Sequence, residues 1–314
     1  MTHGKGAQRQ PAKLRQRTIV SRGRHVLSRL TLRRRKVTGR TVMRHAIIII
    51  LIAIFSFPIY LAVVAASHDA RSLLGAVPLL PGAHLVRNMV ETLTGAGFVN
   101  MTPVSLMLGN SLIMAIGITV GKLAVSIPAA FAVVFFRFPG RMLAFWAIFI
   151  TLLLPVEVRF FPTYEITADL GMLDSFTGLI LPLIASATAT FLFRQFFLTL
   201  PPALADAARI DGAGPMTFLW KIILPLSRPN LAAIAVIEFI YGWNQYLWPL
   251  LAASDGKHQT IVVGMAALIN AANEFSVPQW NLVMAAAILA LLPPVILMLA
   301  MQRWFIEGIT AGMN

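Results

Sequence analysis

Four polar side chains stand inside long apolar stretches of this sequence, where they could bind a charged ligand. Lys122 lies near the middle of one stretch, and Glu238, Asn244 and Gln245 lie in another. Polar groups are costly in segments that cross a membrane, so they are candidates for a translocation path. A lysine in a water-filled path could offset the charge of a phosphate. The alternatives are a structural Lys122–Glu238 ion pair, contacts with another subunit and, for the two amides, bridges between helices.

A second group of residues forms a short amphipathic segment between two apolar runs. It reads Asp206-Ala207-Ala208-Arg209-Ile210-Asp211-Gly212 and is followed by Ile222-Ile223-Leu224-Pro225. Thr199 and the two prolines after it predict the start of a helix over 203–210, which Gly212 would end in a left-handed conformation. Pro215 predicts a second helix that ends before Pro225. Two such helices would present an apolar knob to the cytoplasm, although a hairpin lying on the membrane surface has the same spacing.

The residue types needed for catalysis do not gather in this sequence. The histidines stand at positions 3, 25, 45, 68, 84 and 258, without metal-ligand spacing, and the chain has no cysteine. There is also no Gly-Lys-Ser/Thr loop that would cradle a nucleotide phosphate. We therefore expect no catalytic residue, no metal site and no cofactor.

The composition predicts the elements that position these residues. Hydrophobic residues make up 58% of the chain and charged residues only 12%, and apolar runs of about 18 residues or more can cross a bilayer. Because only helices satisfy their own backbone groups over such runs, we expect an all-α polytopic membrane protein. Six transmembrane helices are predicted, over 46–66, 111–136, 142–161, 178–197, 231–253 and 281–303.

The charge is concentrated at the N-terminus. Of the 26 Lys and Arg residues, 14 lie in residues 1–45 together with no acid, which leaves 12 basic and 12 acidic residues in the rest. A basic tail could bind nucleic acid, but the favoured interpretation is a cytoplasmic anchor that touches membrane lipid, so we expect no nucleic-acid partner. The excess of Lys and Arg in alternate connections places both termini in the cytoplasm.

The expected organisation follows from these patterns. Residues 1–45 form a basic, disordered tail, residues 46–308 form the transmembrane domain, with a cytoplasmic connection at 198–230, and residues 309–314 form a short cytoplasmic C-terminus. Residues 1–42 are expected to be dispensable, with Met43 a candidate start. The outer connection over 254–280 is expected to be an exposed loop.

The segment around Asp206 resembles the signature loop of ABC importer permeases of the carbohydrate-uptake class. The two alanines, Gly212, Ile222 and Leu224-Pro225 match the signature, whereas Asp206 stands where that family usually has Glu. Further segments, at 159–165, 171–175, 181–195, 239–250 and 301–303, resemble the second permease subunits of glycerol-3-phosphate importers. The resemblance covers about residues 55–308 and implies the ABC type I importer permease fold in a bacterial inner membrane.

The resemblance also implies a function and partners. The chain would form a pore with a homologous permease subunit, would be driven by a cytoplasmic ATPase dimer, and would receive sn-glycerol-3-phosphate or glycerophosphodiesters from a periplasmic solute-binding protein. It would be a non-catalytic subunit, coupled to the ATPases through Asp206, Ala207, Ala208, Asp211, Gly212, Ile222, Leu224 and Pro225. In related maltose-type permeases the loop equivalent to 254–280 reaches into the binding protein, which implies a similar use here.

Two alternatives stay open beside this interpretation. A permease for another sugar would share the signature loop. An ion-coupled secondary transporter would show inverted repeats and broken helices, and the sequence shows no such repeat. A membrane enzyme would need a cluster of acids or histidines at one depth, which is absent from the sequence.

Overall fold

The computed structural model describes residues 39–75, 78–95, 102–151, 156–274 and 277–311, with the backbone alone at 39–41, 156–157, 274 and 303–311. The chain divides into two compact units, Met1–Ser56 and Phe57–Asn314. The described part of the first unit is the beginning of helix α2 (Gly39–Ala66). Residues 1–38 of the tail expected over 1–45 lie outside the described residues, whereas residues 39–45 belong to α2.

The described residues are helical in both units, as the composition predicts. After α2, the second unit continues with the elements η2 (Arg71–Leu73), α3 (Leu85–Thr94), α4 (Val104–Phe135), α5 (Arg141–Ile150), α6 (Val156–Asp169), α7 (Phe176–Ile180), η3 (Leu181–Leu183), α8 (Ala187–Thr199), α9 (Ala203–Ile210), α10 (Pro215–Phe218), η4 (Leu219–Ile223), α11 (Leu224–Leu226), α12 (Arg228–Trp243), α13 (Leu247–Ala252), α14 (Ile261–Glu274) and α15 (Trp280–Ala311).

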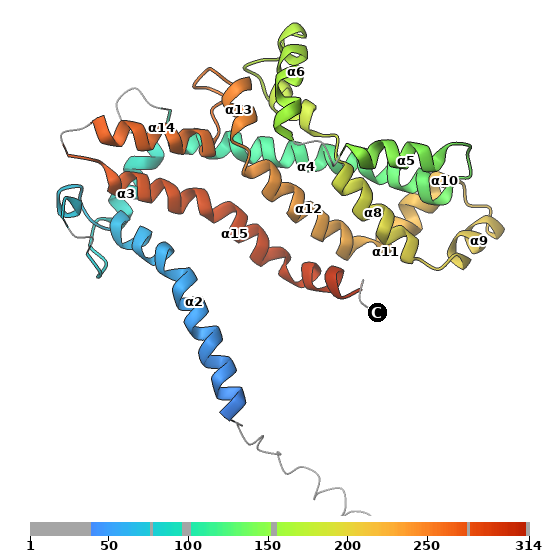
Figure 1. Cartoon of the computed structure of the whole chain (residues 1–314), viewed down its shortest axis with the longest axis horizontal. Coiled ribbons are helices and arrows are strands. Elements are labelled where there is room, and N and C mark those ends of the chain that lie inside the picture. Colours follow the sequence, from blue (N-terminus) through green and yellow to red (C-terminus); the bar gives the residue numbers. More distant parts are fainter. Residues whose placement is uncertain (1–38, 76–77, 96–101, 152–155, 275–276, 312–314) are drawn as a thin grey trace, which may run out of the picture. The chain divides into compact units, whose positions relative to one another are not determined.

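The long helix α4 organises the second unit. Helices α8, α12 and α14 pack against it, and α15 packs against α12, α14 and α3. In Figure 1, α3 and α14 lie at one end of α4, and α9 to α11 lie at the opposite end. The same helix therefore reaches both the 254–280 region and the segment that resembles the signature loop.

Small residues allow α4 to approach its neighbours closely. A Cβ added to Gly242 of α12 would lie 3.0 Å from the Cα of Ala115, and one added to Gly121 would lie 2.3 Å from a methyl group of Ile184. Contacts this short leave no room for any larger side chain. The glycines thus set the spacing of α4, α12 and the α7–α8 region around Lys122.

The expected six regular spans are not confirmed. Three helices in the described residues are long and apolar enough to cross a membrane, at Val42–Ala66, Val104–Phe135 and Trp280–Gln302. Two bent pairs pass the same test together, Phe176–Leu183 with Ala187–Thr199 at 47° and Pro215–Leu226 with Arg228–Trp243 at 80°. If each bent pair is one span, the described residues hold up to five.

Three of the predicted spans are wrong as single regular helices. The span over 142–161 is two helices, α5 ending at Ile150 and α6 beginning at Val156. The span over 178–197 breaks before α8, where the Ser186 hydroxyl accepts the amide of Ala189 and starts a new helix. The span over 231–253 breaks after Trp243, where the Gln245 side chain donates to the carbonyl of Tyr241. Side chains that bond to the backbone compete with the helical ladder, and apolarity alone does not reveal this.

The prediction of an exposed loop over 254–280 is also wrong. Most of this stretch is α14, whose residues Ile261, Leu268 and Ala272 are completely or almost completely buried in a core shared with α4, α12 and α15. The polar residues Asn270 and Asn273 lie on the exposed side of the helix. The apolar residues of this stretch recur with a helical period near 3.6, which predicts a helix. The prediction of a loop considered only the polar residues and overlooked this spacing.

Candidate functional site

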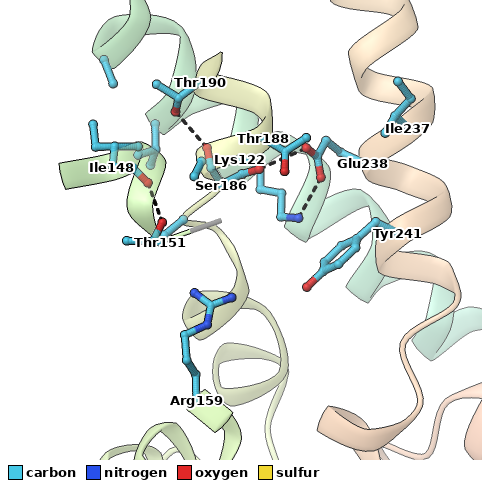
Figure 2. Close-up of a pocket in the computed structure, with 14 residues that line it drawn as sticks. Lys122, Ile148, Thr151, Arg159, Ser186, Thr188, Thr190, Ile237, Glu238 and Tyr241 are labelled. Carbon is cyan, nitrogen blue, oxygen red and sulfur yellow. Dashed lines mark hydrogen bonds and ion pairs between the residues drawn. The ribbon is translucent and has the colours of Figure 1, made fainter. Parts of the chain in front are cut away.

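A cavity of about 420 Å³ lies among α4, α5, α6, α8 and α12, and Lys122 and Glu238 line it (Figure 2). Its wall also contains Arg159, Tyr241 and residues 185–188 at the start of α8. The cavity is therefore lined by helices that the sequence places in four of its predicted spans. It combines apolar walls with a few convergent polar groups, as ligand sites commonly do.

Lys122 and Glu238 form a buried ion pair. The Lys122 Nζ lies 2.7 Å from the Glu238 Oε2, and the two side chains are 6% and 3% exposed. The Ser186 hydroxyl donates to the other carboxylate oxygen at 3.1 Å. The lysine Nζ also lies 3.4 Å from the centroid of the Tyr241 ring, within the range of a cation–π contact. The structural Lys122–Glu238 ion pair, which the sequence offered as one of several alternatives, is thus present. Both of its charged groups have partners within the chain.

Local packing positions this pair. Lys122 follows Gly121, which lies against Ile184, and Glu238 precedes Gly242 by one helical turn. The close contact of Gly242 with Ala115 brings α12 near enough to α4 for the two charged side chains to meet. Ser186 reaches Glu238 because the chain leaves its helix there to begin α8. Three separate segments therefore define the geometry of one carboxylate.

Arg159 is a cavity residue that the sequence analysis missed. It extends from α6 toward the open centre of the cavity, as Figure 2 shows. The side chain is exposed, and among the described residues it makes no ion pair or hydrogen bond. The signal was available, because a cation inside the apolar stretch 142–161 is as costly as one at position 122.

Asn244 and Gln245 do not join this cavity. Asn244 is exposed at the C-terminal end of α12, and Gln245 donates to the backbone carbonyl of Tyr241 at 3.1 Å. Both lie at the break between α12 and α13. The Gln245 side chain bonds to the last turn of α12, and neither amide residue lines the cavity with Lys122.

The segment with the coupling candidates forms two short helical pieces joined by a tight turn. Helix α9 covers Ala203–Ile210, as predicted, and Gly212 has a φ of +71°, which confirms the left-handed turn. The amide of Ala213 donates to the carbonyl of Ala208, and the amide of Gly212 donates to that of Arg209. These two bonds form a Schellman motif, in which glycine is favoured because it has no Cβ.

Two details of the prediction for this segment are wrong. Thr199 does not cap α9, because it is the last residue of α8 and its hydroxyl donates to the carbonyl of Phe196. The second helix does not end before Pro225, but continues through the π-helical turn η4 into α11, which ends at Leu226. Pro225 has no amide to donate to the preceding turn, and the chain takes the π-helical turn η4 directly before α11.

The coupling candidates divide into buried and exposed residues. Ala208 is buried, Ile222 and Leu224 are half-buried, and the others are exposed: Asp206, Ala207, Asp211, Gly212 and Pro225. The Asp206–Arg209 pair is 3.3 Å long, with side chains 68% and 65% exposed. Large apolar side chains also face outward, at Ile210, Met216 and Trp220. The segment thus presents a mixed apolar and charged surface.

An aromatic cluster attaches this segment to the end of α4. The Phe218 ring lies 5.2 Å from the Phe135 ring and 6.0 Å from the Phe131 ring, measured between centroids. Ala208 and Ile223 are buried in the same core. This packing joins α9, α10 and η4 to the end of α4 in one core.

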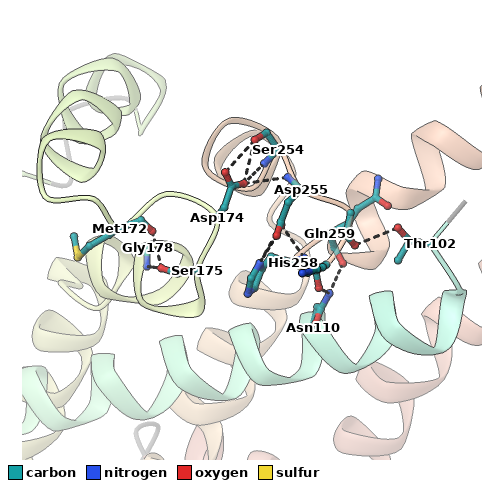
Figure 3. A network of polar contacts seen from close by, with 12 residues as sticks. Thr102, Asn110, Met172, Asp174, Ser175, Gly178, Ser254, Asp255, His258 and Gln259 are labelled. Atoms are coloured by element: carbon teal, nitrogen blue, oxygen red, sulfur yellow. Dashed lines mark hydrogen bonds and ion pairs between the residues drawn. The ribbon is translucent and has the colours of Figure 1, made fainter.

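A third polar region joins the connection before α7 to the connection before α14 (Figure 3). The Asp174 carboxylate accepts the amides of Ser254 and Asp255 at 2.6 and 3.0 Å. Hydrogen bonds from those backbone amides lower the pKa of Asp174 below its ordinary value. Asn110 of α4 donates to the carbonyls of Lys257 and Gln259 at 2.8 and 2.9 Å. The segment that precedes α14 is therefore held to α4 and to the connection before α7.

Comparison with known proteins identifies the class of this chain. Residues 122–310 match the family of binding-protein-dependent transport system inner membrane components. The chain belongs to this family, and it is accordingly a permease component of a transport system in the inner membrane. The match includes both the cavity and the α9–α11 segment.

Individual relatives narrow the comparison. The chain is 56% identical over 272 residues to the sn-glycerol-3-phosphate transport system permease protein UgpE of Yersinia pestis bv. Antiqua, which covers 86% of this chain and 96% of the relative. It is 55% identical to the UgpE protein of Pectobacterium atrosepticum over 273 residues, with the same coverage. Among solved structures, a bacterial ABC transporter that imports the acidic polysaccharide alginate matches with a TM-score of 0.73 and 20% identity, over 86% of this chain and 98% of that one. That likeness confirms the fold of an ABC importer permease.

Proposed function

We propose that this chain is a permease subunit of an ATP-driven importer for sn-glycerol-3-phosphate or glycerophosphodiesters. The observation that supports it best is the cavity among the helices, which contains Lys122 and Arg159. Cations in a water-accessible cavity favour an anionic cargo such as a phosphate ester, and neutral sugars have no need of them. The UgpE relatives, which are named as permeases for sn-glycerol-3-phosphate, support the same cargo.

The coupling role belongs to α9, α10 and η4. The exposed apolar residues Ile210, Met216 and Trp220 favour contact with another protein, since several large apolar groups exposed on one short segment are typical of an interface. We assign this surface to a cytoplasmic ATPase. The aromatic contacts of Phe218 would pass ATPase closure on to α4.

The remaining partners follow from the same assignment. A homologous permease would complete the pore, and a periplasmic solute-binding protein would deliver the cargo, in keeping with the binding-protein-dependent family. Lipid surrounds the apolar helices, both termini are cytoplasmic, and ATP hydrolysis occurs on the partner subunits. The chain itself is then a non-catalytic component, and nucleic acid plays no part.

Reconstitution tests this function directly. The chain would be assembled with its second permease and ATPase in proteoliposomes, with the solute-binding protein and labelled sn-glycerol-3-phosphate on the outside and ATP on the inside. We expect ATP-dependent uptake that maltose does not compete with. Competition by a neutral sugar would indicate the sugar-permease alternative. Uptake driven by an ion gradient without ATP would indicate a secondary transporter.

A further inference from the structure

The two cations of the cavity, Lys122 and Arg159, differ in whether their charged groups already have interaction partners within the chain. The Lys122 Nζ has a carboxylate oxygen at 2.7 Å and an aromatic ring centroid at 3.4 Å. Its side chain is almost completely buried. A ligand that approached Lys122 would therefore compete with Glu238 for it.

Glu238 cannot give up Lys122 without a large cost. Its carboxylate is buried, and its other hydrogen bond in the described residues comes from the neutral Ser186 hydroxyl. A buried carboxylate that loses its cation is strongly destabilised. An anion bound by Lys122 would have to offset that loss, so the pair serves better as a fixed part of the cavity wall than as a ligand site.

Arg159 has the opposite character. It lies on α6, lines the same cavity, is exposed, and within the described part of the chain has no ion-pair or hydrogen-bond partner. A guanidinium presents a planar fork of donors that matches two phosphate oxygens, and it keeps its charge at any physiological pH. The Thr188 hydroxyl, in the first turn of α8, is also exposed to this cavity, and no hydrogen bond to another described residue engages it. Arg159 and Thr188 are therefore two donors of this cavity that have no hydrogen-bond partner among the described residues.

We propose that Arg159 binds the phosphate group of the cargo in this cavity, with Thr188 as a second donor, and that the Lys122–Glu238 pair positions the wall without binding the anion. The assignment deepens the proposed function and rests on it. The ligand class is a phosphate ester, either a monoester or a diester, because both present at least two non-bridging oxygens that share negative charge to a guanidinium.

The absence of cysteine from this chain allows a charge test at one position. Arg159→Cys would be reconstituted in the full importer and treated with methanethiosulfonate reagents that attach an ethylammonium, a methyl or an ethylsulfonate group. We expect the untreated variant to lose about tenfold or more in uptake at subsaturating sn-glycerol-3-phosphate, since one charge-assisted contact is lost. Only the ethylammonium adduct should restore uptake, because it alone returns the positive charge.

A second readout separates ligand binding from a structural role. The yield of the assembled importer and its thermal midpoint in detergent should equal the wild-type values in Arg159→Cys, because Arg159 makes no ion pair or hydrogen bond within the described residues. Arg71→Cys is the matched control, since Arg71 is exposed and does not line the cavity. If Arg159→Cys is not recovered as a complex, Arg159→Lys and Arg159→Gln give the same comparison, with uptake retained in part by Lys and lost by Gln.

The outcomes that overturn the assignment are distinct from those that overturn the function. Two outcomes would refute the role of Arg159 and leave the proposed function intact. In the first, Arg159→Cys takes up the phosphate ester as fast as the wild-type importer does. In the second, the neutral methyl adduct restores uptake as well as the ethylammonium adduct does. Failure of the wild-type importer to take up any phosphate ester would refute the proposed function, and the assignment with it.

Discussion

The cavity and the α9–α11 segment each contain one ion pair, and the two pairs differ in almost every respect. Lys122 and Glu238 come from helices α4 and α12, lie 2.7 Å apart and are at most 6% exposed. Arg209 and Asp206 come from a single helix, lie 3.3 Å apart and are at least 65% exposed. Buried pairs resist the loss of either partner, whereas exposed pairs contribute little to stability.

The difference indicates that the Lys122–Glu238 pair stabilises the packing of helices, whereas the exposed pair on α9 belongs to a surface that can bind a partner. Around Lys122, side chains from three segments satisfy one another, so this part of the cavity wall is closed to new polar partners. On α9, the charges and the neighbouring Ile210 are exposed, at 87% for Ile210, and their partners in the described residues are few. The first region holds helices together, and the second is available to another protein.

The largest effect is expected when one partner of the buried pair is neutralised. Glu238→Gln leaves Lys122 charged in a buried site, and a loss of about 3–5 kcal/mol in unfolding free energy is expected. Denaturant titration of the purified complex in detergent would measure it. The control is the double variant with Met at both positions, which should recover most of the loss because no charge stays unpaired. If Glu238→Gln alone were as stable as the wild type, water would have to reach the Lys122 ammonium in spite of its burial.

The turn at Gly212 is expected to give the next largest effect, seen in coupling more than in stability. Gly212→Leu places a Cβ in left-handed backbone at a cost of about 1–2 kcal/mol, although nothing lies within 4 Å of that position. We expect the complex to assemble while substrate-stimulated ATP hydrolysis falls to near the basal rate. Gly212→Asn is the matched control, since Asn tolerates this conformation and should retain most of the activity. Normal stimulation in Gly212→Leu would exclude the turn from coupling.

Asp174 is intermediate between the two pairs, since it is half-buried and accepts two backbone amides. Hydrogen bonds from the amides of Asp255 and Ser254 hold the pKa of its carboxyl below the ordinary value. A lowered pKa in the folded state means that the contribution is present above about pH 4 and is lost as the pH falls through the folded value. Hydrogen exchange at Ser254 and Asp255, corrected for the intrinsic rate, should stay slow down to about pH 4. In Asp174→Asn the same amides should exchange faster at neutral pH, and equal rates in the two proteins would contradict the role of this network.

The smallest effect is expected for the exposed pair on α9. Asp206→Ala and Arg209→Ala should each change the unfolding free energy by about 0.5 kcal/mol or less, as is usual for exposed i, i+3 pairs. The same denaturant titration that reports on Glu238→Gln would measure it, so the two pairs can be compared directly. A loss near that of the buried pair would mean that α9 is not free in the assembled complex.

Much of the local structure could be predicted from the sequence. The run 203–210 predicts a helix, Gly212 predicts its left-handed end, and the structure has both. These features depend on backbone preferences that act within a few residues. The predicted boundaries failed where a side chain binds the backbone, as at Ser186, Gln245 and Thr199, because the same residue types are compatible with helix and with helix end.

The candidate site could be predicted only in part. Lys122 and Glu238 were selected because charges in apolar stretches are rare, and the structure brings them together across 116 positions of the chain. Asn244 and Gln245 satisfied the same criterion and lie elsewhere. Arg159 was overlooked because its assignment depended on where a span ends, and 142–161 is two helices.

The sequence by itself determined the class of this protein. Its apolar runs, its lack of catalytic clusters and its signature segment are properties of composition and short-range spacing, which the chain carries whether or not it is folded. Only the tertiary structure decided which charges are used and which are available. That distinction depends on distances between α4, α6, α8 and α12, which are set by close contacts such as Gly242 on Ala115, and packing between segments more than a hundred residues apart leaves no periodic trace in the sequence.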